Sequence, residues 1–247
     1  MIHLKNHNEI EKLYRAGQVV KETLFTIEEN IKAGISTLEL DKIAEEFIVS
    51  NNAIPGFKGI YGYPSTLCIS IDNEVVHGLP SNRLLENGQI VSIDVGSIYE
   101  GFYGDHAKTF IVGQTTNEKK ELVDVTLKCL DIGIEQAKIG NRIGDIGFSI
   151  QKYAESFGFG VVRELVGHGI GSKLHEEPQV PNYGHAGTGP LIEPGLCLAI
   201  EPMINLGSEE VFTKDDGWTV CTKDGKVSAH FEHSIAICED EIRILTK

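Results

Sequence analysis

The feature that most constrains the fold is a pattern of helices and strands that occurs twice along the chain. Apolar periodicity predicts two helices followed by strands, and the same order then returns. KAGISTLELDKIAEEF, beginning at Lys32, aligns with KIGNRIGDIGFSIQKY, beginning at Lys138, at an offset of 106 residues. LLENGQIVSID, ending at Asp94, aligns with LIEPGLCLAIE, ending at Glu201, at an offset of 107. Helix and strand patterns can match by chance, but two alignments at nearly one offset predict an internal repeat with halves of roughly 1–115 and 116–247.

The repeat puts an acidic residue at the same point of a strand in each half. Asp94 lies within IVSIDVG and Glu201 within CLAIEPM, both of them apolar runs. Each strand is followed by another that carries an acid, Asp105 in GDHAKTF and Glu232 in AHFEHSIAI. One acid in a strand is more often an edge residue or a satisfied core carboxylate. The repeated placement predicts instead that the four acids converge where the halves meet.

A hairpin gives the first two acids a definite relation. A turn centred between Tyr99 and Glu100 would put Asp94 and Asp105 opposite each other, with Cβ atoms about 5 Å apart. Burying like charges without a partner is costly. Four converging carboxylates carry a charge of about −4, which two divalent cations would balance. Such oxygen-rich sites suit hard or borderline ions such as Mn, Fe, Co or Zn.

Three histidines stand in settings that favour a site. His168 is flanked by glycines in GHGIG, His175 follows it in the same stretch, and His77 stands in NEVVHGLP, where a strand gives way to a turn. A lone histidine is more often a surface or hydrogen-bonded residue than a ligand. That interpretation is kept for the remaining six, which are His3, His7, His106, His185, His230 and His233.

Composition excludes several classes of partner. A net charge of −14 argues against binding to nucleic acid or to an anionic membrane. There is no apolar run near 18 residues and no secretory leader, so neither membrane spanning nor secretion is expected. The five cysteines are scattered and form no C-x-x-C pair, which fits a reducing cytoplasm.

Taken together, the motifs resemble those of the type I methionine aminopeptidases, in the short bacterial form. They are HGLP, IDVG…GDHAKTF, GHGIG…HEEPQV, IEPM, DGWTV and EHSI, and the resemblance covers nearly the whole chain. It implies an α+β pita-bread fold with two pseudo-symmetric halves, each of helices packed on antiparallel strands. It also implies that residues 1–247 form a single catalytic domain.

The resemblance also implies the site residues. Two divalent ions, of uncertain identity among Co, Mn, Fe and Zn, would be held by five ligands, while two histidines line the substrate site without binding metal. A pocket for the methionine side chain would involve three further residues, of which the two aromatic ones could equally be ordinary core residues. The ligands are Asp94, Asp105, His168, Glu201 and Glu232, the substrate histidines are His77 and His175, and the pocket residues are Tyr63, Cys68 and Trp218.

The implied reaction is removal of the N-terminal methionine from nascent proteins, with a small second residue preferred. A metal-bridging hydroxide would attack the first peptide bond, Glu201 would transfer protons, and His77 and His175 would assist. The implied setting is a cytoplasmic monomer that meets nascent polypeptide N-termini at the ribosome. Two alternatives stay open: another aminopeptidase or prolidase of the same fold, and a noncatalytic module that binds proteins or RNA.

Overall fold

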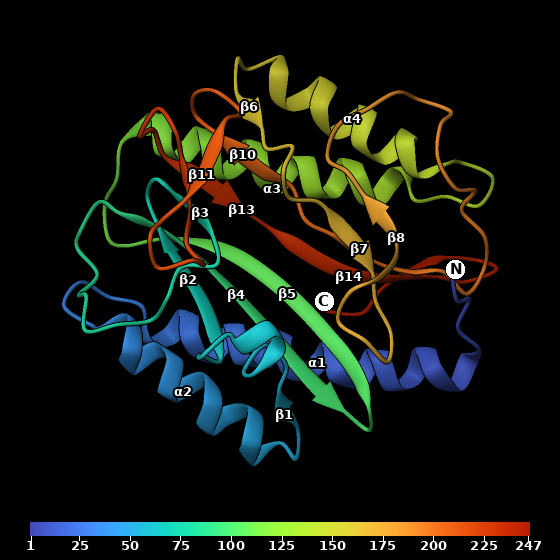
Figure 1. Ribbon diagram of the computed structural model, residues 1–247, viewed down its shortest axis with the longest axis horizontal. Helices are drawn as coiled ribbons and strands as arrows, with labels where there is room; N and C mark the ends of the chain where they lie inside the picture. The colour runs from blue at the N-terminus through green and yellow to red at the C-terminus, as the bar shows by residue number, and fades with distance from the viewer.

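A computed structural model describes residues 1–247 as four α-helices, one short 3-10 helix and fifteen strands, which gives the expected α+β class (Figure 1). None of the helices combines the length and apolar composition that crossing a bilayer requires. The helices are α1 (His7–Asn30), α2 (Thr37–Ser50), α3 (Asn117–Gln136) and α4 (Ile143–Glu155), and η1 is Ile60–Gly62.

Nine strands form one antiparallel sheet through the middle of the molecule, and two three-stranded sheets lie beside it. The long path is β1 (Ile54–Pro55), β4 (Ile90–Tyr99), β5 (Phe102–Ile111), β14 (Glu232–Ile237), β9 (Cys197–Ile200), β7 (Gly167–Gly169) and β8 (Glu176–Val180). β2 (Leu67–Ile71) pairs with β4, and β15 (Ile242–Ile244) pairs with β14. The small sheets are β13 (Ser228–His230), β10 (Met203–Asn205) and β6 (Gly160–Val161), and β11 (Val211–Thr213), β12 (Val220–Thr222) and β3 (Glu74–Val76).

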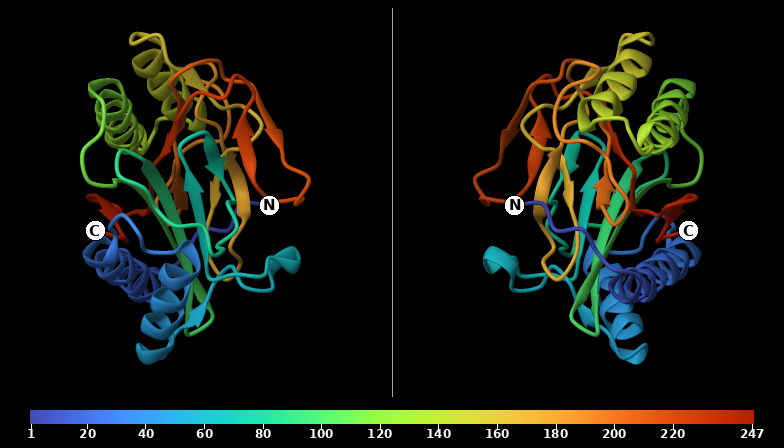
Figure 2. Two further views of the ribbon diagram at one scale, coloured as in Figure 1. Left: turned by 90° about the vertical axis from the view of Figure 1, so that its left-hand side faces the viewer. Right: turned by 90° about the vertical axis from the view of Figure 1, so that its right-hand side faces the viewer.

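The helices lie on one side of the large sheet, α1 and α2 beside the first half of the chain and α3 and α4 beside the second (Figure 2). Alternation along β4 explains the separation of the two faces, because Val91, Ile93 and Val95 pack into the core under α1 and α2. Asp94, between them, points to the opposite face. The helices thus leave one face of the sheet free for a site.

The two halves share small details as well as element order. An isolated β-bridge joins Ser36 to Leu84 before α2, and another joins Arg142 to Leu191 before α4. These pairs stand at the same offsets as the sequence alignments, which supports the internal repeat. β5 of the first half pairs directly with β14 of the second, so the halves share one sheet. The boundary of the repeat near residue 115 stays a prediction.

The β4–β5 hairpin turns one residue later than we expected. Tyr99 pairs with Phe102, so Glu100 and Gly101 are the two turn residues, and both have positive φ (48° and 81°). That geometry is typical of the two-residue turns that suit the twist of a hairpin, and glycine adopts it without strain. The expectation that the two acids lie opposite each other was therefore wrong: Asp94 opposes Ala107, and Asp105 opposes Gly96. A shift of two residues keeps both on one face.

Candidate metal centre

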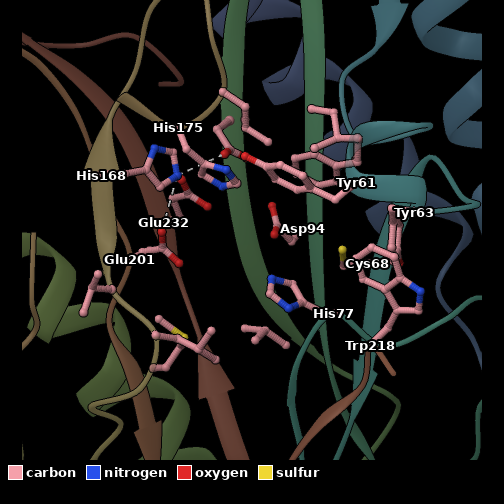
Figure 3. Close-up of a pocket in the computed structure, with 18 residues that line it drawn as sticks. Tyr61, Tyr63, Cys68, His77, Asp94, His168, His175, Glu201, Trp218 and Glu232 are labelled. Carbon is pink, nitrogen blue, oxygen red and sulfur yellow. Dashed lines mark ion pairs between the residues drawn. The ribbon is translucent and has the colours of Figure 1, made fainter. Parts of the chain in front are cut away.

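The five predicted ligands lie along the free face of the large sheet. Asp94 and Asp105 come from the β4–β5 hairpin, His168 is the middle residue of β7, and Glu232 begins β14. Glu201 follows the last residue of β9, where Pro202 interrupts the chain before β10. All five line one cavity together with His77 and His175 (Figure 3).

The spacing of the ligand atoms suits shared cations better than hydrogen bonds. His168 Nε2 lies 3.7 Å from Asp105 Oδ2 and 3.6 Å from Glu201 Oε1. Hydrogen bonds between such groups are shorter than about 3.2 Å, whereas two atoms each bonded at about 2.1 Å to one ion lie about 3.0–3.6 Å apart at ordinary coordination angles. Asp105, His168 and Glu232 each offer a ligand atom within 4.8 Å of the others.

Three buried carboxylate oxygens have no hydrogen-bond partner within the protein. They are Asp94 Oδ1, Asp105 Oδ1 and Glu232 Oε1. Leaving a buried polar atom without a partner costs about 1–3 kcal/mol, and more for a charged group. The three residues that carry these oxygens line one cavity, and carboxylate oxygens are ligands that divalent ions prefer. The residues present therefore fit a metal centre.

Burial raises the pKa values of all four carboxyl groups, and neighbouring carboxylates add to the effect for Asp94, Glu201 and Glu232. Burial raises the pKa of Asp105 to about 7. Burial raises the pKa of Asp94 well above its usual range, and the charges of Asp105 and Glu201 add to the effect. The pKa values of Glu201 and Glu232 rise for the same two reasons, burial first and the neighbouring carboxylates second. A bound cation would reverse this electrostatic cost.

The hydrogen bond at Nδ1 of His168 leaves its Nε2 available to bind a metal ion. Its Nδ1 lies 2.9 Å from the carbonyl oxygen of Gly169, which can only accept, so Nδ1 carries the proton and Nε2 keeps its lone pair. Burial, with a smaller effect from His175, lowers the pKa of His168 to about 4, and the ring is therefore neutral at pH 7. A neutral imidazole with a free Nε2 is the form that binds metal.

The two other expected histidines border the centre. His175 packs edge-on against His168, with ring centroids 4.5 Å apart, and burial lowers its pKa. His77 follows β3 with a φ of 58°, a conformation that side chains rarely adopt, and burial lowers its pKa too. Strained backbone of this kind concentrates at functional sites.

The apolar end of the cavity contains the three expected pocket residues. Tyr63 and Trp218 meet edge to face, with ring centroids 5.0 Å apart, and the Tyr63 hydroxyl donates to the carbonyl of Leu67 at 2.9 Å. Cys68 pairs with Asp94 across β2 and β4, so the apolar end adjoins the carboxylates. Figure 3 shows these three side chains across the cavity from His168 and Glu201. The cavity holds about 260 Å³, enough for a small side chain.

Two residues near the centre were missed by sequence reasoning. Tyr61 has a φ of 49°, is 82% exposed, and stacks in parallel with His175 at 6.2 Å. His230, which we interpreted as a surface or hydrogen-bonded residue, has its Nε2 3.6 Å from Glu201 Oε2 and forms a group of possible metal ligands with Glu201 and Glu232. The alternation of AHFEHSIAI, which puts His230 and Glu232 on one side of the chain, was the signal that could have found it.

Comparison with known proteins identifies the family. The sequence model of Metallopeptidase family M24 matches residues 11–239. The chain belongs to metallopeptidase family M24. A protein named methionine aminopeptidase from Clostridium perfringens is 52% identical to this M24 peptidase over 246 residues, which cover 100% of this chain and 99% of that one.

Solved structures agree with the family and with the pita-bread fold. The crystal structure of methionine aminopeptidase from Thermotoga maritima superimposes on this M24 peptidase with a TM-score of 0.98, at 46% identity and with 100% of both chains covered. Prolidase from Pyrococcus furiosus gives a TM-score of 0.82 at 22% identity, covering 99% of this chain and 65% of that one. At that identity the prolidase likeness shows the fold alone. The expected resemblance to the type I methionine aminopeptidases is confirmed.

Proposed function

We propose that this metallopeptidase removes the N-terminal methionine from polypeptides. The observation that carries the proposal is the two-ended cavity, with orphaned carboxylate oxygens at one end and Tyr63, Cys68 and Trp218 at the other. A methionine side chain would occupy the apolar end while the first peptide bond would lie against the polar end. The relatives named methionine aminopeptidase support the same reaction.

Two divalent ions per chain would balance the four carboxylates. Bound there, they would supply Lewis-acid activation of water and of the scissile carbonyl. Mn, Fe, Co and Zn all suit this mixture of oxygen and imidazole donors, and availability decides among them. The residues that would hold the ions are Asp94, Asp105, His168, Glu201 and Glu232.

Three side chains would handle protons and charge during the reaction. Glu201 would accept a proton from the attacking water and pass it to the leaving amine, because its carboxylate adjoins the reacting centre. His175, neutral at pH 7, would donate a hydrogen bond to the carbonyl oxygen and to the oxyanion that follows. His77 would contact the substrate near the scissile amide.

The position of the acids explains why only the first residue is removed. The substrate's free α-amine would lie at the end of the cavity formed by Asp94 and Asp105, and an internal peptide bond offers no such amine. We extend the proposal to a small second residue, to nascent chains at the ribosome as substrates, and to a monomer in the cytoplasm. These points follow from the family resemblance.

Two alternative functions are less well supported. A prolidase is supported only by likeness of fold at 22% identity. A noncatalytic binding module has no need for a complete set of ligands, and in this chain all five ligand types are intact.

The test is a metal-restoration assay on chelated, metal-free protein. Met-Ala-Ser, N-acetyl-Met-Ala-Ser and Ala-Pro are incubated with Mn²⁺, Fe²⁺, Co²⁺ or Zn²⁺ added separately. We expect free methionine from Met-Ala-Ser alone, and only after metal is restored. Cleavage of Ala-Pro in preference would favour a prolidase, and no methionine release with any ion would contradict the proposal.

A further inference from the structure

The Glu201 carboxylate lies between two imidazole rings. Its Oε1 is 3.6 Å from His168 Nε2, and its Oε2 is 3.6 Å from His230 Nε2. His168 is among the residues that line the cavity, whereas His230 is not among them and is 1% exposed. The two oxygens of one carboxylate therefore face different surroundings, the cavity and the protein interior.

His230 has no other use for this nitrogen within the protein. The residue is 1% exposed, and its Nε2 is a buried polar atom without a hydrogen-bond partner. A buried imidazole nitrogen in that state costs free energy unless it finds a partner. The Glu201 carboxylate is the acceptor that an Nε2 proton can reach by a small rotation of either side chain.

The backbone holds His230 firmly in this position. Its amide donates to Thr109 Oγ1 at 2.9 Å, and its carbonyl accepts from the same hydroxyl at 2.8 Å. β13 also pairs with β10, where His230 faces Met203 in the register. Because β10 follows Glu201 and Pro202 directly, His230 and Glu201 are fixed by neighbouring strands.

We infer that His230 is a positioning residue for Glu201. The two atoms lie 3.6 Å apart, so a small rotation would bring Nε2–H within hydrogen-bond distance of Glu201 Oε2, and that bond would hold Oε1 toward His168 and the reacting centre. A carboxylate that binds metal or accepts a proton works best when its second oxygen is hydrogen-bonded, because free rotation would carry the first oxygen out of place. The inference rests on the proposed function, since it assumes that Glu201 acts in the metal centre.

The experiment compares His230→Leu, which removes the donor, with His230→Gln, which keeps an N–H of similar reach. Mn²⁺ affinity is measured by calorimetry on metal-free protein, and kcat and KM are measured on Met-Ala-Ser. We expect His230→Leu to weaken Mn²⁺ binding by about 10–100-fold, the usual loss when a partner of a metal ligand is removed. We expect its kcat to fall with KM little changed, and His230→Gln to stay within about threefold of wild type in both measurements.

A matched control is His233→Leu, a buried histidine whose Nδ1 pairs with Thr246 Oγ1 at 2.7 Å and not with the centre. Thermal unfolding of all three variants reports folding separately from metal affinity. Wild-type affinity and kcat in His230→Leu would overturn the inference, and so would equal losses in His230→Leu and His233→Leu. Failure of the wild-type protein to bind Mn²⁺ or release methionine would instead count against the proposed function.

Discussion

His168 and His175 belong to one glycine-rich stretch, yet their rings are suited to different roles. His168 donates its Nδ1 proton to the Gly169 carbonyl, which leaves the lone pair of Nε2 free. His175 lies edge-on to His168 and stacks on Tyr61, which leaves it at the border of the cavity. In the proposed reaction, one ring would hold an ion and the other would contact the substrate carbonyl.

We predict that His175→Ala keeps the metal and loses turnover. Removing one donor to an oxyanion lowers kcat by about 10²–10³-fold. Mn²⁺ affinity should stay close to that of wild type, because His175 is outside the proposed ligand set. Steady-state kinetics and calorimetry check the two halves of the prediction.

The control is His185→Ala, which removes an exposed histidine of a loop outside the cavity. Normal turnover in His175→Ala would show that the oxyanion does not depend on this ring.

For single residues, the sequence identified candidates for the site where an acid interrupted a strongly apolar run. An acid inside IVSIDVG or CLAIEPM is conspicuous because its neighbours are apolar, and the repeat doubled that signal. His230 was missed because its significance depends on a distance to Glu201, and those two residues come from different strands. Without that distance, a lone histidine is interpreted as a surface or hydrogen-bonded residue.

Helix α1 packs directly against the backbone of the β4–β5 hairpin. A Cβ atom added at Gly104 in β5 would lie 2.5 Å from the Ala16 carbonyl carbon and 2.6 Å from its oxygen. On β4, the Ser97 hydroxyl donates to the same Ala16 carbonyl at 3.0 Å. The helix therefore rests on the hairpin backbone, one residue away from Asp105.

We predict that Gly104→Ala destabilises the protein by about 1–3 kcal/mol, the usual cost of overpacking. The obstructing atoms belong to the helix backbone, so truncating the Ala16 side chain gives no relief. The double variant Gly104→Ala/Ala16→Gly should be at least as unstable as Gly104→Ala in urea unfolding. Recovery of stability in the double variant would contradict this account of the contact.

The sequence predicted whether a segment is a helix or a strand better than it predicted where each helix or strand ends. Ser36 and Thr116 cap α2 and α3, because their side chains accept from backbone amides three residues on, and serine and threonine are preferred at this position. Two strands that we expected to be continuous are broken. LCLAIEPM is interrupted at Pro202, which has no amide proton, and AHFEHSIAI is interrupted at Phe231 as the chain passes between two sheets.

For the whole molecule, the metal should determine how stability responds to alkaline pH. The folded-state pKa of Asp105 is raised from 3.8 to about 7, and the pKa values of Asp94, Glu201 and Glu232 are raised further from their usual range. A raised carboxyl pKa means that the folded state binds the proton more tightly. The resulting stability is complete below the unfolded pKa and is lost as pH rises through the folded pKa.

We predict that metal-free protein loses thermal stability as the pH rises from 6.5 through the folded-state pKa values of these carboxyls, of which that of Asp105 is about 7, and that saturating Mn²⁺ removes most of this loss. The buried histidines do not oppose the trend in that range, because their pKa values are lowered and they are neutral in both states above their ordinary pKa of 6.5. Melting temperatures measured with chelator and with Mn²⁺ check the prediction. Parallel curves for the two forms would argue against charge balance by the metal.

The halves meet where β5 pairs with β14, and the proposed ligands come from both sides of that junction. Asp94 and Asp105 are synthesised early, while Glu232 comes after all the other ligands in the chain. A growing polypeptide therefore lacks one of the proposed ligands until its last strands have been synthesised. Metal binding at the proposed site would therefore require both halves to have folded together, and partial translation products would stay catalytically inactive.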